Sequence, residues 1–464
     1  MGFFKAYDMR GTFGEDFDLD TVYKVGRALP DVIARADLKL DAGRASALQR
    51  PRILVGRDCR TTSKDVRDSL VRGLEDGGAS VFDLGPSTTP MVYFFTAEDG
   101  YDGSIMVTAS HNPPSDNGLK VSMRTALPIG YANGLDEVER AVMGGVVQGF
   151  RGGEGTAEVV QDSVERYVAW MADKVPADDF AGLKFAVDCS NGMASMLARR
   201  LFPSAVILND VPDGAFPAHS PNPLKADARE QISRVVREQG LDCGVIFDGD
   251  ADRAMFVDEN GEFVQPDYLI PIVAEACSRC GESRVVLHDV RTSRGVIETL
   301  RERGFEPVMV PVGHAFAKPE MRKRGALCGG ELAGHYYFGD FFGCDSGALA
   351  ALRILSRAAQ SLRSGVSFSG MVRPISSRFA NSGEMNFKVE DKDAAIARVL
   401  VTAAGFGAER GRCSIDGVRL EFDDGWISVR KSNTEPYLRL LVEHRTKNGL
   451  GEWVGALGEA VDGR

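Results

Sequence analysis

The sequence predicts an α/β protein of three similar α/β domains with mixed sheets, followed by a smaller C-terminal α+β domain. Its 464 residues are too many for one hydrophobic core, which rarely grows past about 250–300 residues. Short apolar runs rich in Val and Ile alternate with amphipathic stretches, as is typical of βα units. One strand–loop pattern also occurs three times. We therefore expect duplicated domains whose loops converge on a central cleft.

The repeated pattern is an apolar run, an Asp and a polar turn that can open a helix, and it occurs around Asp58, Asp188 and Asp289. Each copy is followed by a second apolar segment that ends in a loop of reactive side chains. These loops are TASHNPP (108–114), DGDADR (248–253) and GGELAGHYYF (329–338). Ligand loops of α/β sheets lie beyond the carboxyl ends of the strands, where we expect all three. On this pattern alone, three unrelated α/β segments remain the alternative.

The sequence changes in character after about residue 370. Residues 385–445 indicate a strand, a helix and three strands, with a hairpin turn at residues 423–425. The stretch MVRPISSRF (371–379) is expected to join this part to the rest. The predicted domains are residues 1–156, 157–257, 258–371 and 372–464.

Composition narrows the class of protein. The chain is 44% hydrophobic and 26% charged with a net charge of −11, which disfavours nucleic-acid or anionic-membrane partners. We find no signal peptide, no apolar run near the roughly 18 residues of a spanning helix, and Ala6 where a myristoylation motif needs Ser or Thr. A cytoplasmic enzyme is therefore expected, and one that handles phosphate must gather its cations in short basic loops.

Eight cysteines are scattered along the chain, which suits a reducing compartment. The one close pair, Cys277 and Cys280, falls in a helix-like stretch. No second pair completes a zinc site, so a redox or metal role there stays a minor alternative.

The TASHNPP loop places Ser110 at the end of a predicted strand, and Pro113 and Pro114 stiffen the loop. A nucleophilic serine normally needs a base, and His111 is adjacent. Neighbouring side chains of an extended segment point to opposite faces, so we do not expect His111 to deprotonate Ser110. The Gly-x-Ser-x-Gly elbow of hydrolases is absent. A merely structural serine is the alternative.

The DGDADR loop carries Asp248, Asp250 and Asp252 at alternating positions. Three carboxylates this close would repel one another, so a hard cation such as Mg²⁺ is the simplest explanation. An EF-hand is disfavoured because Arg253 stands where its turn glycine belongs and the flanks predict strands. Glu259 at the twelfth position is then a coincidence. A surface acidic turn remains the alternative.

Two further loops offer groups for a sugar phosphate. Glu331 and His335 follow paired glycines in GGELAGHYYF, and Glu331 could accept hydrogen bonds from sugar hydroxyls. In RKSNTEP (430–436), a planar guanidinium stands beside neutral donors, which suits phosphate binding, although a solvated basic turn is the alternative. These residues are Arg430, Ser432, Asn433 and Thr434.

Other basic residues are isolated. Arg10 lies in YDMRG near the N-terminus, Lys120 follows an Asn-Gly turn on a predicted strand, and His314 and Lys318 are spaced as on a helix. A nucleophile, a cation site, a hydroxyl-binding loop and a phosphate-binding loop together indicate phosphoryl transfer to a sugar.

The motifs TASHNPPSDNGLK, DGDADR, GGELAGH and RKSNTEP, in this order, resemble the four signature loops of the α-D-phosphohexomutases. YDMRG, VGRDCRTTS, VDCSNGMAS and FPAHSPNP extend the resemblance over nearly the whole chain, and the length and the HYYF and CDSG stretches look most like bacterial phosphomannomutase/phosphoglucomutase. The resemblance implies three α/β domains and a smaller fourth. It also implies a mutase that interconverts hexose 6-phosphate and hexose 1-phosphate of mannose and/or glucose.

The resemblance also implies a role for each matching residue. Ser110 would carry a phosphate and pass it through a hexose 1,6-bisphosphate, while one Mg²⁺ per chain would be held by that phosphoserine and by Asp248, Asp250 and Asp252. The implied catalytic residues are Ser110, Arg10, Lys120, Arg253 and His314, the last with Lys120 or Arg10 for proton transfer. The implied substrate-binding residues are Tyr7, His111, Arg291, Glu331, His335, Arg430, Ser432, Asn433 and Thr434.

Two positions depart from the family pattern. Ala333 stands where the sugar loop commonly has Ser, and Arg291 stands where related mutases often have Lys. Sugar preference is thus left open, with a phosphoglucosamine mutase as the alternative enzyme. A catalytically silent sugar-phosphate-binding relative is disfavoured by the intact serine and aspartates. The predicted partner is a phosphosugar, and the sequence carries no signal for an oligomeric state.

Overall fold

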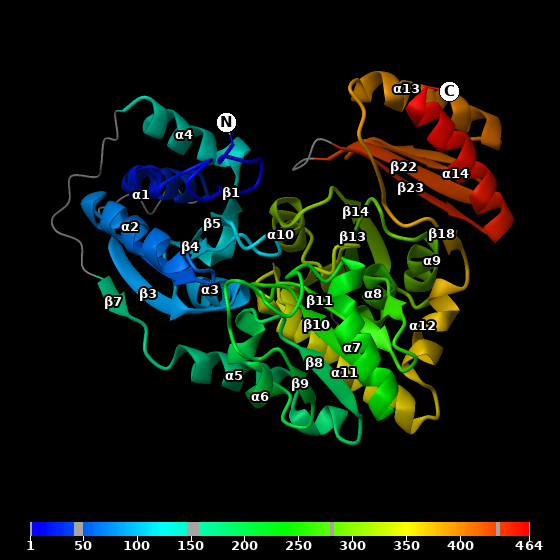
Figure 1. Ribbon diagram of the computed structural model, residues 1–464, viewed down its shortest axis with the longest axis horizontal. Helices are drawn as coiled ribbons and strands as arrows, with labels where there is room; N and C mark the ends of the chain where they lie inside the picture. The colour runs from blue at the N-terminus through cyan, green and yellow to red at the C-terminus, as the bar shows by residue number, and fades with distance from the viewer. Residues whose placement is uncertain (1, 41–49, 146–156, 279–282, 433–436, 464) are drawn as a thin grey trace.

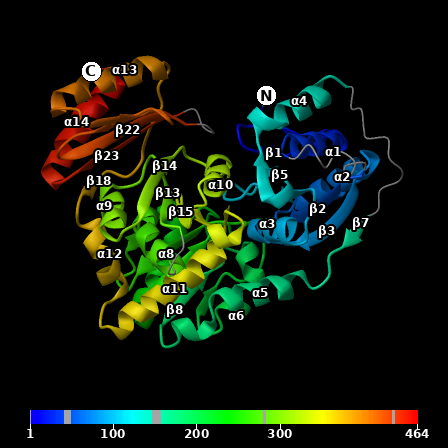
Figure 2. The same ribbon diagram turned by 180° about the vertical axis from the view of Figure 1, so that it is seen from behind.

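A computed structural model describes residues 2–40, 50–145, 157–278, 283–432 and 437–463, which form four domains, each built around its own sheet (Figure 1). The first domain, blue to cyan, and the fourth, orange to red, lie at opposite upper corners of the view. The second and third domains lie below and between them, as Figure 2 shows from behind. No helix among the described residues is long and apolar enough to cross a membrane.

The first domain has the strand order β1-β5-β4-β2-β3-β7, with β6 paired to β5. Its strands are β1 (Met9–Thr12), β2 (Arg52–Arg57), β3 (Ser80–Pro86), β4 (Gly103–Val107), β5 (Asp116–Met123), β6 (Leu127–Ile129) and β7 (Ala157–Val159). Its helices are α1 (Leu19–Leu40), α2 (Ser63–Asp76), α3 (Thr89–Glu98) and α4 (Leu135–Met143), with 3₁₀ turns η2 (Arg124–Ala126) and η3 (Tyr131–Asn133). Every residue of β4 is buried, as expected for a strand covered on both faces.

The second domain has the strand order β12-β11-β10-β8-β9. Its strands are β8 (Phe185–Asp188), β9 (Val206–Leu208), β10 (Cys243–Phe247), β11 (Ala254–Asp258) and β12 (Phe263–Val264). Its helices are α5 (Ser163–Lys174), α6 (Ala198–Leu201) and α7 (Ala226–Gln239), with η4 (Ala177–Phe180) and η5 (Met193–Met196).

The third domain has the strand order β14-β13-β15-β16-β17. Its strands are β13 (Val285–Asp289), β14 (Glu306–Val310), β15 (Cys328–Gly330), β16 (Tyr336–Phe338) and β17 (Cys344–Asp345). Its helices are α8 (Ile270–Cys277), α9 (Arg294–Glu302), α10 (His314–Lys323), α11 (Gly347–Arg363) and α12 (Phe368–Ser376), with η6 (Pro266–Leu269) and η7 (Gly339–Phe341).

These three sheets repeat one topology. In each, a central strand (β2, β8 or β13) lies between two parallel neighbours, and the neighbour that leads to the reactive loop pairs on its other side with an antiparallel strand. The carboxylates of Asp58, Asp188 and Asp289, just beyond or at the ends of the central strands, each accept a hydrogen bond from the backbone N–H two residues on. The repeated sequence pattern therefore reflects a repeated turn.

The fourth domain has the strand order β18-β23-β22-β21-β20, with β19 paired to β23. Its elements are β18 (Ala380–Asn381), β19 (Met385–Phe387), α13 (Lys392–Ala403), η8 (Ala404–Phe406), β20 (Gly411–Cys413), β21 (Val418–Glu421), β22 (Gly425–Lys431), β23 (Leu438–His444) and α14 (Lys447–Asp462). The hairpin predicted at residues 423–425 joins β21 to β22. The sequence reading missed α14, whose Trp453 and Leu457 pack in the domain core.

Two predicted boundaries, after residues 257 and 371, and part of the predicted linker fall inside elements, while the boundary after residue 156 falls directly before β7. β7 pairs with β3, so the first sheet passes residue 156, and β12 pairs with β11, so the second passes residue 257. The stretch 371–376 belongs to α12, which is capped by Ser367 and buries Phe368, Val372 and Ile375 along one side. Glu259 accepts hydrogen bonds from the backbone and hydroxyl of Ser369, so it anchors this helix.

The hydrophobic core divides the molecule in two. One continuous cluster runs through domains one to three and includes Tyr93 of α3, Phe185 of β8 and Leu349 of α11. The fourth domain has a separate core, and a small cluster of Leu332, Trp426 and Leu441 connects it to the third. The loops of the first three domains are thus held by shared packing, while those of the fourth belong to a separate body.

Candidate active site

Ser110 lies beyond the end of β4 and is only 2% exposed. Its backbone N–H donates to the Thr108 hydroxyl (2.9 Å), and its φ of 53° is in the left-handed region. The buried guanidinium of Arg60 donates to the carbonyl oxygens of Ser110, Asn112, Pro113 and Asp116. Hydrogen bonds from Arg60 to backbone carbonyls therefore fix the conformation of the loop, in addition to its two prolines.

The expectation that the Ser110 and His111 side chains point to opposite faces is wrong. Its Nδ1 lies 3.2 Å from the Ser110 Oγ, because the left-handed turn at Ser110 brings the two neighbouring side chains to the same side. Burial, followed by the charges of Arg253 and Arg10, lowers the pKa of His111 well below its ordinary value. The Ser110 hydroxyl has one proton, so the neutral imidazole can accept it only in place of Asp248 Oδ2.

The three aspartates of the β10–β11 loop are completely buried, and their ligand oxygens lie within 4.8 Å of one another. Asp248 Oδ2 accepts a hydrogen bond from Ser110 Oγ at 3.0 Å. Asp250 Oδ1 and Asp252 Oδ1 are buried and have no hydrogen-bond partner. Buried, unsatisfied carboxylate oxygens beside a hydroxyl are the donor set that a hard divalent cation requires, so these residues fit Mg²⁺.

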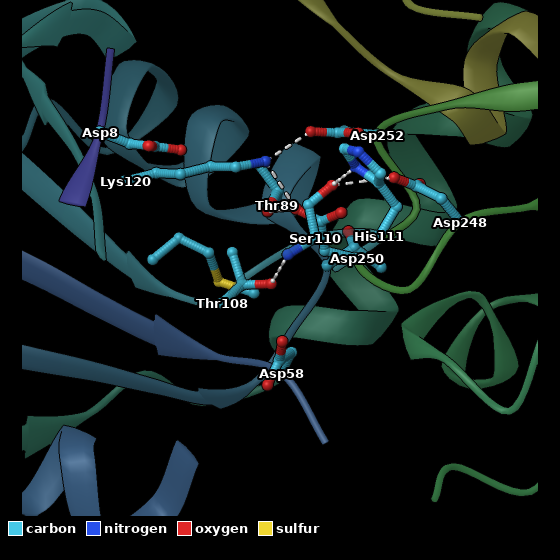
Figure 3. Close-up of polar contacts among 12 residues, drawn as sticks. Asp8, Asp58, Thr89, Thr108, Ser110, His111, Lys120, Asp248, Asp250 and Asp252 are labelled. Carbon is cyan, nitrogen blue, oxygen red and sulfur yellow. Dashed lines mark hydrogen bonds and ion pairs between the residues drawn. The ribbon is translucent and has the colours of Figure 1, made fainter. Parts of the chain in front are cut away.

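Lys120, on β5, reaches the same cluster, as Figure 3 shows. Its Nζ lies 2.7 Å from Asp250 Oδ2 and 2.6 Å from Asp252 Oδ2. Burial disfavours the ammonium, but the two carboxylates outweigh it and raise the pKa of Lys120. Burial and the charges of Asp252 and Asp250 raise the pKa of Asp248 well above its ordinary value. The cluster thus sets three carboxylates against the ammonium of Lys120 and the guanidinium of Arg253, whose Nε lies 3.7 Å from Asp248 Oδ2.

A hydrogen-bonded chain joins the β10–β11 loop to the third domain. Arg253 Nε, which can only donate, lies 2.9 Å from His335 Nε2, so the His335 proton sits on Nδ1 and points to Asp345 Oδ2 at 2.8 Å. Asp345 Oδ1 forms an ion pair with buried Lys318 at 2.9 Å. Burial opposes the Asp345 carboxylate, but Lys318 and His335 lower its pKa strongly.

Sequence reasoning did not single out Asp345, although a signal was present. It ends a short strand before a helix, which is the position that Asp58, Asp188 and Asp289 occupy in the repeated pattern.

Arg10 and His314 both lie near enough to Lys120 to interact with it electrostatically. Arg10, whose strand pairs with β5, donates to Asp8 (2.6 Å) and Asn112 (3.0 Å). His314 opens α10, its ring centroid 6.5 Å from that of Tyr7 and 6.4 Å from that of His335. Desolvation, followed by the charges of Lys318 and Lys120, lowers the pKa of His314 to about 3, and its Nδ1 has no hydrogen-bond partner. A neutral imidazole is therefore available there.

The GGELAGHYYF segment (329–338) continues from β15 into a loop that begins at Glu331. The Oε1 of Glu331 accepts a hydrogen bond from the Tyr337 hydroxyl at 2.5 Å. Arg291 Nη2 lies 3.7 Å from Glu331 Oε2 and donates to Asp289 at 2.6 Å. The Glu331 carboxylate and the Arg291 guanidinium therefore lie side by side at the start of this loop.

The fourth-domain loop starts at the end of β22. Arg430 is buried, and its Nη2 donates to Glu384 Oε1 at 2.9 Å. Arg439 donates to the other oxygen of Glu384 at 3.0 Å, and Arg291 of the third domain lies 3.7 Å from Oε1. Ser432 donates its backbone N–H to the Tyr437 carbonyl oxygen, whereas Asn433 and Thr434 lie outside the described residues.

Glu384 therefore stands among three guanidinium groups at the junction of the third and fourth domains. Sequence reasoning missed it, because a lone Glu in a short loop forms no pattern with its neighbours.

This topology and this site define the class of protein: a multidomain enzyme with a buried serine, a carboxylate cluster and converging cations, as phosphoryl transfer requires. Family models of phosphoglucomutase/phosphomannomutase match all four domains. They cover residues 1–143 (alpha/beta/alpha domain I), 165–261 (domain II), 265–374 (domain III) and 384–457 (C-terminal domain).

Individual proteins agree with these matches. The phosphomannomutase of Salmonella montevideo is 35% identical over 456 residues, which cover 95% of this chain and 94% of that protein. A protein named phosphohexose mutases from Xanthomonas campestris pv. campestris (strain B100) is 35% identical over 455 residues, 97% of this chain and 96% of its own. A phosphoglucomutase/phosphomannomutase family protein of Burkholderia thailandensis has a solved structure with a TM-score of 0.84 and 28% identity, covering 99% of this chain and 97% of that one. The chain belongs to the phosphoglucomutase/phosphomannomutase family and is a phosphohexomutase, an intramolecular phosphotransferase.

Proposed function

We propose that this enzyme interconverts hexose 6-phosphate and hexose 1-phosphate of mannose and/or glucose through a phosphoserine at Ser110. The observation that carries the proposal is the Ser110 hydroxyl, 3.0 Å from Asp248 in a buried carboxylate cluster that also contacts Lys120. The names of the relatives, phosphomannomutase and phosphohexose mutases, support the choice of sugar.

Asp248, Asp250 and Asp252, with a phosphoserine oxygen, are the residues that would hold one Mg²⁺. When bound, the ion would supply positive charge beside the transferring phosphoryl group, which the cluster lacks. The orphaned oxygens of Asp250 and Asp252 support this assignment.

The protein's own part in the transfer is positioning and neutralisation of charge. Lys120, Arg253 and Arg10 approach the serine loop from three directions and would surround the equatorial oxygens of the phosphoryl group. A loose transition state needs little covalent help, so fixed cations in a buried site supply most of the rate. Arg253 is itself oriented by His335.

A sugar hydroxyl must lose its proton as it receives the phosphoryl group. His314 is neutral, with an orphaned ring nitrogen, and we assign it to proton transfer together with Lys120 or Arg10. His111, at 3.2 Å from Ser110 Oγ, is a second neutral imidazole that would act on the serine itself when the phosphate returns.

The resulting hexose 1,6-bisphosphate must turn end over end before its other phosphate returns to Ser110. Glu331 and Arg291, with Tyr7 and His335, would bind the sugar. The non-transferring phosphate would be bound by Arg430, Ser432, Asn433 and Thr434. The separate core of the fourth domain supports a clamp that loosens during this turn.

The test is a comparison of initial rates on mannose 1-phosphate, glucose 1-phosphate and glucosamine 1-phosphate with a trace of hexose 1,6-bisphosphate. We expect turnover of the first two. Preference for the amino sugar would indicate a phosphoglucosamine mutase, and no turnover of any would indicate a silent relative.

The phosphoserine is tested separately by intact mass and peptide mapping. We expect a fraction of the purified protein to carry one phosphate at Ser110. Ser110→Ala should lose this phosphate and the activity, while Ser115→Ala, in the exposed part of the same loop, keeps both. Phosphate found only at another residue would refute the assignment.

A further inference from the structure

A cavity of about 800 Å³ lies where the first three domains meet, and none of the site residues named above lines it. Its walls include Thr125 of the first domain, Lys174 of the second and α8, α10 and α11 of the third. This volume is typical of sites that admit small molecules. Cys277, the last residue of α8, lines the cavity and is 8% exposed.

Two groups act on the Cys277 sulfur. Arg353, buried on α11, donates Nη1 to Sγ at 2.7 Å and Nη2 to Asp340 at 2.6 Å. Cys328 begins β15, which packs against α8, and its thiol is near enough to shift the pKa of Cys277. The sequence suggested a pair of Cys277 with Cys280. The partner found here is Cys328, and Cys280 lies outside the described residues.

A guanidinium beside a sulfur stabilises its thiolate, which is the nucleophilic form. Burial alone would raise the pKa of Cys277, but the Cys328 hydrogen bond and Arg353 outweigh it and lower that pKa. Burial raises the pKa of Cys59, Cys189 and Cys243. Among the cysteines that the structure describes, Cys277 thus combines an adjacent cation, a thiol neighbour and access to a cavity.

We infer that Cys277 is a modification site, a thiolate that reacts with a small hydroperoxide entering this cavity, and that Cys328 then forms a disulfide with it. In the first step the Cys277 sulfur attacks the O–O bond of hydrogen peroxide, giving a sulfenic acid and, after protonation, water. In the second step the Cys328 thiol displaces the hydroxyl from that sulfur, which forms the disulfide and releases a second water. The peroxide is reduced and the two thiols are oxidised.

The position of Cys328 links this chemistry to the active site. β15 runs from Cys328 to Gly330 and leads directly into Glu331. A disulfide would therefore tie α8 to the strand that presents the sugar loop.

The first test compares alkylation rates of individual cysteines with iodoacetamide, followed by peptide mapping. Below its pKa an ordinary thiol gains about tenfold in rate per pH unit, because only the thiolate reacts. We expect the Cys277 rate to rise by clearly less than tenfold per pH unit between about pH 7 and about pH 9. A full tenfold rise per unit over this range would show that Cys277 is an ordinary thiol and would refute the assignment.

Two variants separate the role of Arg353 from general structure. Arg353→Met should lower the Cys277 rate at neutral pH about tenfold or more and restore its dependence on pH. Asp340→Asn removes the other partner of Arg353 and should leave the Cys277 rate high. If Arg353→Met does not fold, the pH profile of the wild-type protein still decides.

The second test adds dilute hydrogen peroxide and then blocks free thiols with N-ethylmaleimide. We expect a linked peptide that contains Cys277 and Cys328. In Cys328→Ser the reaction should stop at a sulfenic acid, which dimedone captures on Cys277. A link between Cys277 and Cys280, or oxidation of Cys413 ahead of Cys277, would refute the assignment.

Discussion

Glu384 occupies the place where the fourth domain is proposed to bind a substrate phosphate. Its carboxylate accepts from Arg430 at 2.9 Å and from Arg439 at 3.0 Å, and Arg291 lies 3.7 Å away. A phosphate that accepts a hydrogen bond from Arg430 Nη2 must replace the Glu384 carboxylate as its partner. Glu384→Gln keeps the size and one acceptor but removes the charge, so we expect phosphosugars to bind more tightly.

The size of the effect follows from the number of hydrogen bonds exchanged. A hydrogen bond to a charged group contributes about 1 kcal/mol more than a neutral one. If only the Arg430 contact is exchanged, the gain is about fivefold in affinity. If the Arg439 contact is lost as well, the gain is about 2 kcal/mol, or roughly 30-fold. We therefore expect KM for the phosphosugar to fall by about 5- to 30-fold, with release of product slowed.

The assay measures KM for glucose 1-phosphate and the Kd of inorganic phosphate by calorimetry. Glu409→Gln is the matched control, since Glu409 pairs with Arg412 on the surface of the same domain and should change neither. Weaker binding in Glu384→Gln would refute the reasoning, because it would mean that Glu384 orients Arg430 toward the phosphate.

Three further predictions concern other parts of the molecule. Arg430→Ala should weaken phosphosugar binding about 10- to 150-fold and increase escape of labelled bisphosphate, while Ser110 still accepts phosphate; unchanged binding and release would leave the fourth domain without its role. Asp250→Asn should fold normally and lose its Mg²⁺-dependent activity. A variant with the wild-type rate in Mg²⁺ would show that the DGDADR loop is an acidic turn and not a metal site. Burial opposes the His219 cation, but Asp188 outweighs it and raises the pKa of His219. The His219 cation therefore stabilises the fold fully below the unfolded pKa of about 6.5, and this stabilisation is lost as pH rises through the folded pKa. The free energies of unfolding of wild type and His219→Gln, measured by urea titration, should differ more near pH 5.5 than near pH 8.5.

The parts of the site that one loop contains could be predicted from the sequence. Ser110 and its prolines are contiguous, and so are Asp248, Asp250 and Asp252, so their proximity needs no tertiary information. The duplicated α/β domains could also be predicted, because each domain has a strand, an Asp and a turn in which the Asp accepts a hydrogen bond from the backbone N–H two residues on.

What could not be predicted depends on the path of the backbone or on contacts between domains. The contact of Ser110 with His111 depends on one left-handed residue, which the sequence reading took as extended. The link from Arg253 through His335 joins two domains, and Glu384 gains its role only from arginines far away in the sequence. α12 was read as a linker because Ser and Pro mask the spacing of its buried residues.

The separate core of the fourth domain suits the proposed mechanism, in which a bisphosphate intermediate turns over within the site. Ser110, the aspartates and Lys120 come from the first two domains, whose packing is continuous through α3 with the third, so their distances are fixed by a shared core. Arg430, which we propose to bind the non-transferring phosphate, stands on a domain with its own core. That domain is joined to the third by Leu332, Trp426 and Leu441 and by ion pairs such as Arg294 with Glu421. Ion pairs near the surface cost little to break, whereas opening a continuous apolar core would expose many buried side chains. We therefore expect the fourth domain to move more easily against the third than the first three domains move against one another, which suits the proposed release and uptake of a phosphate.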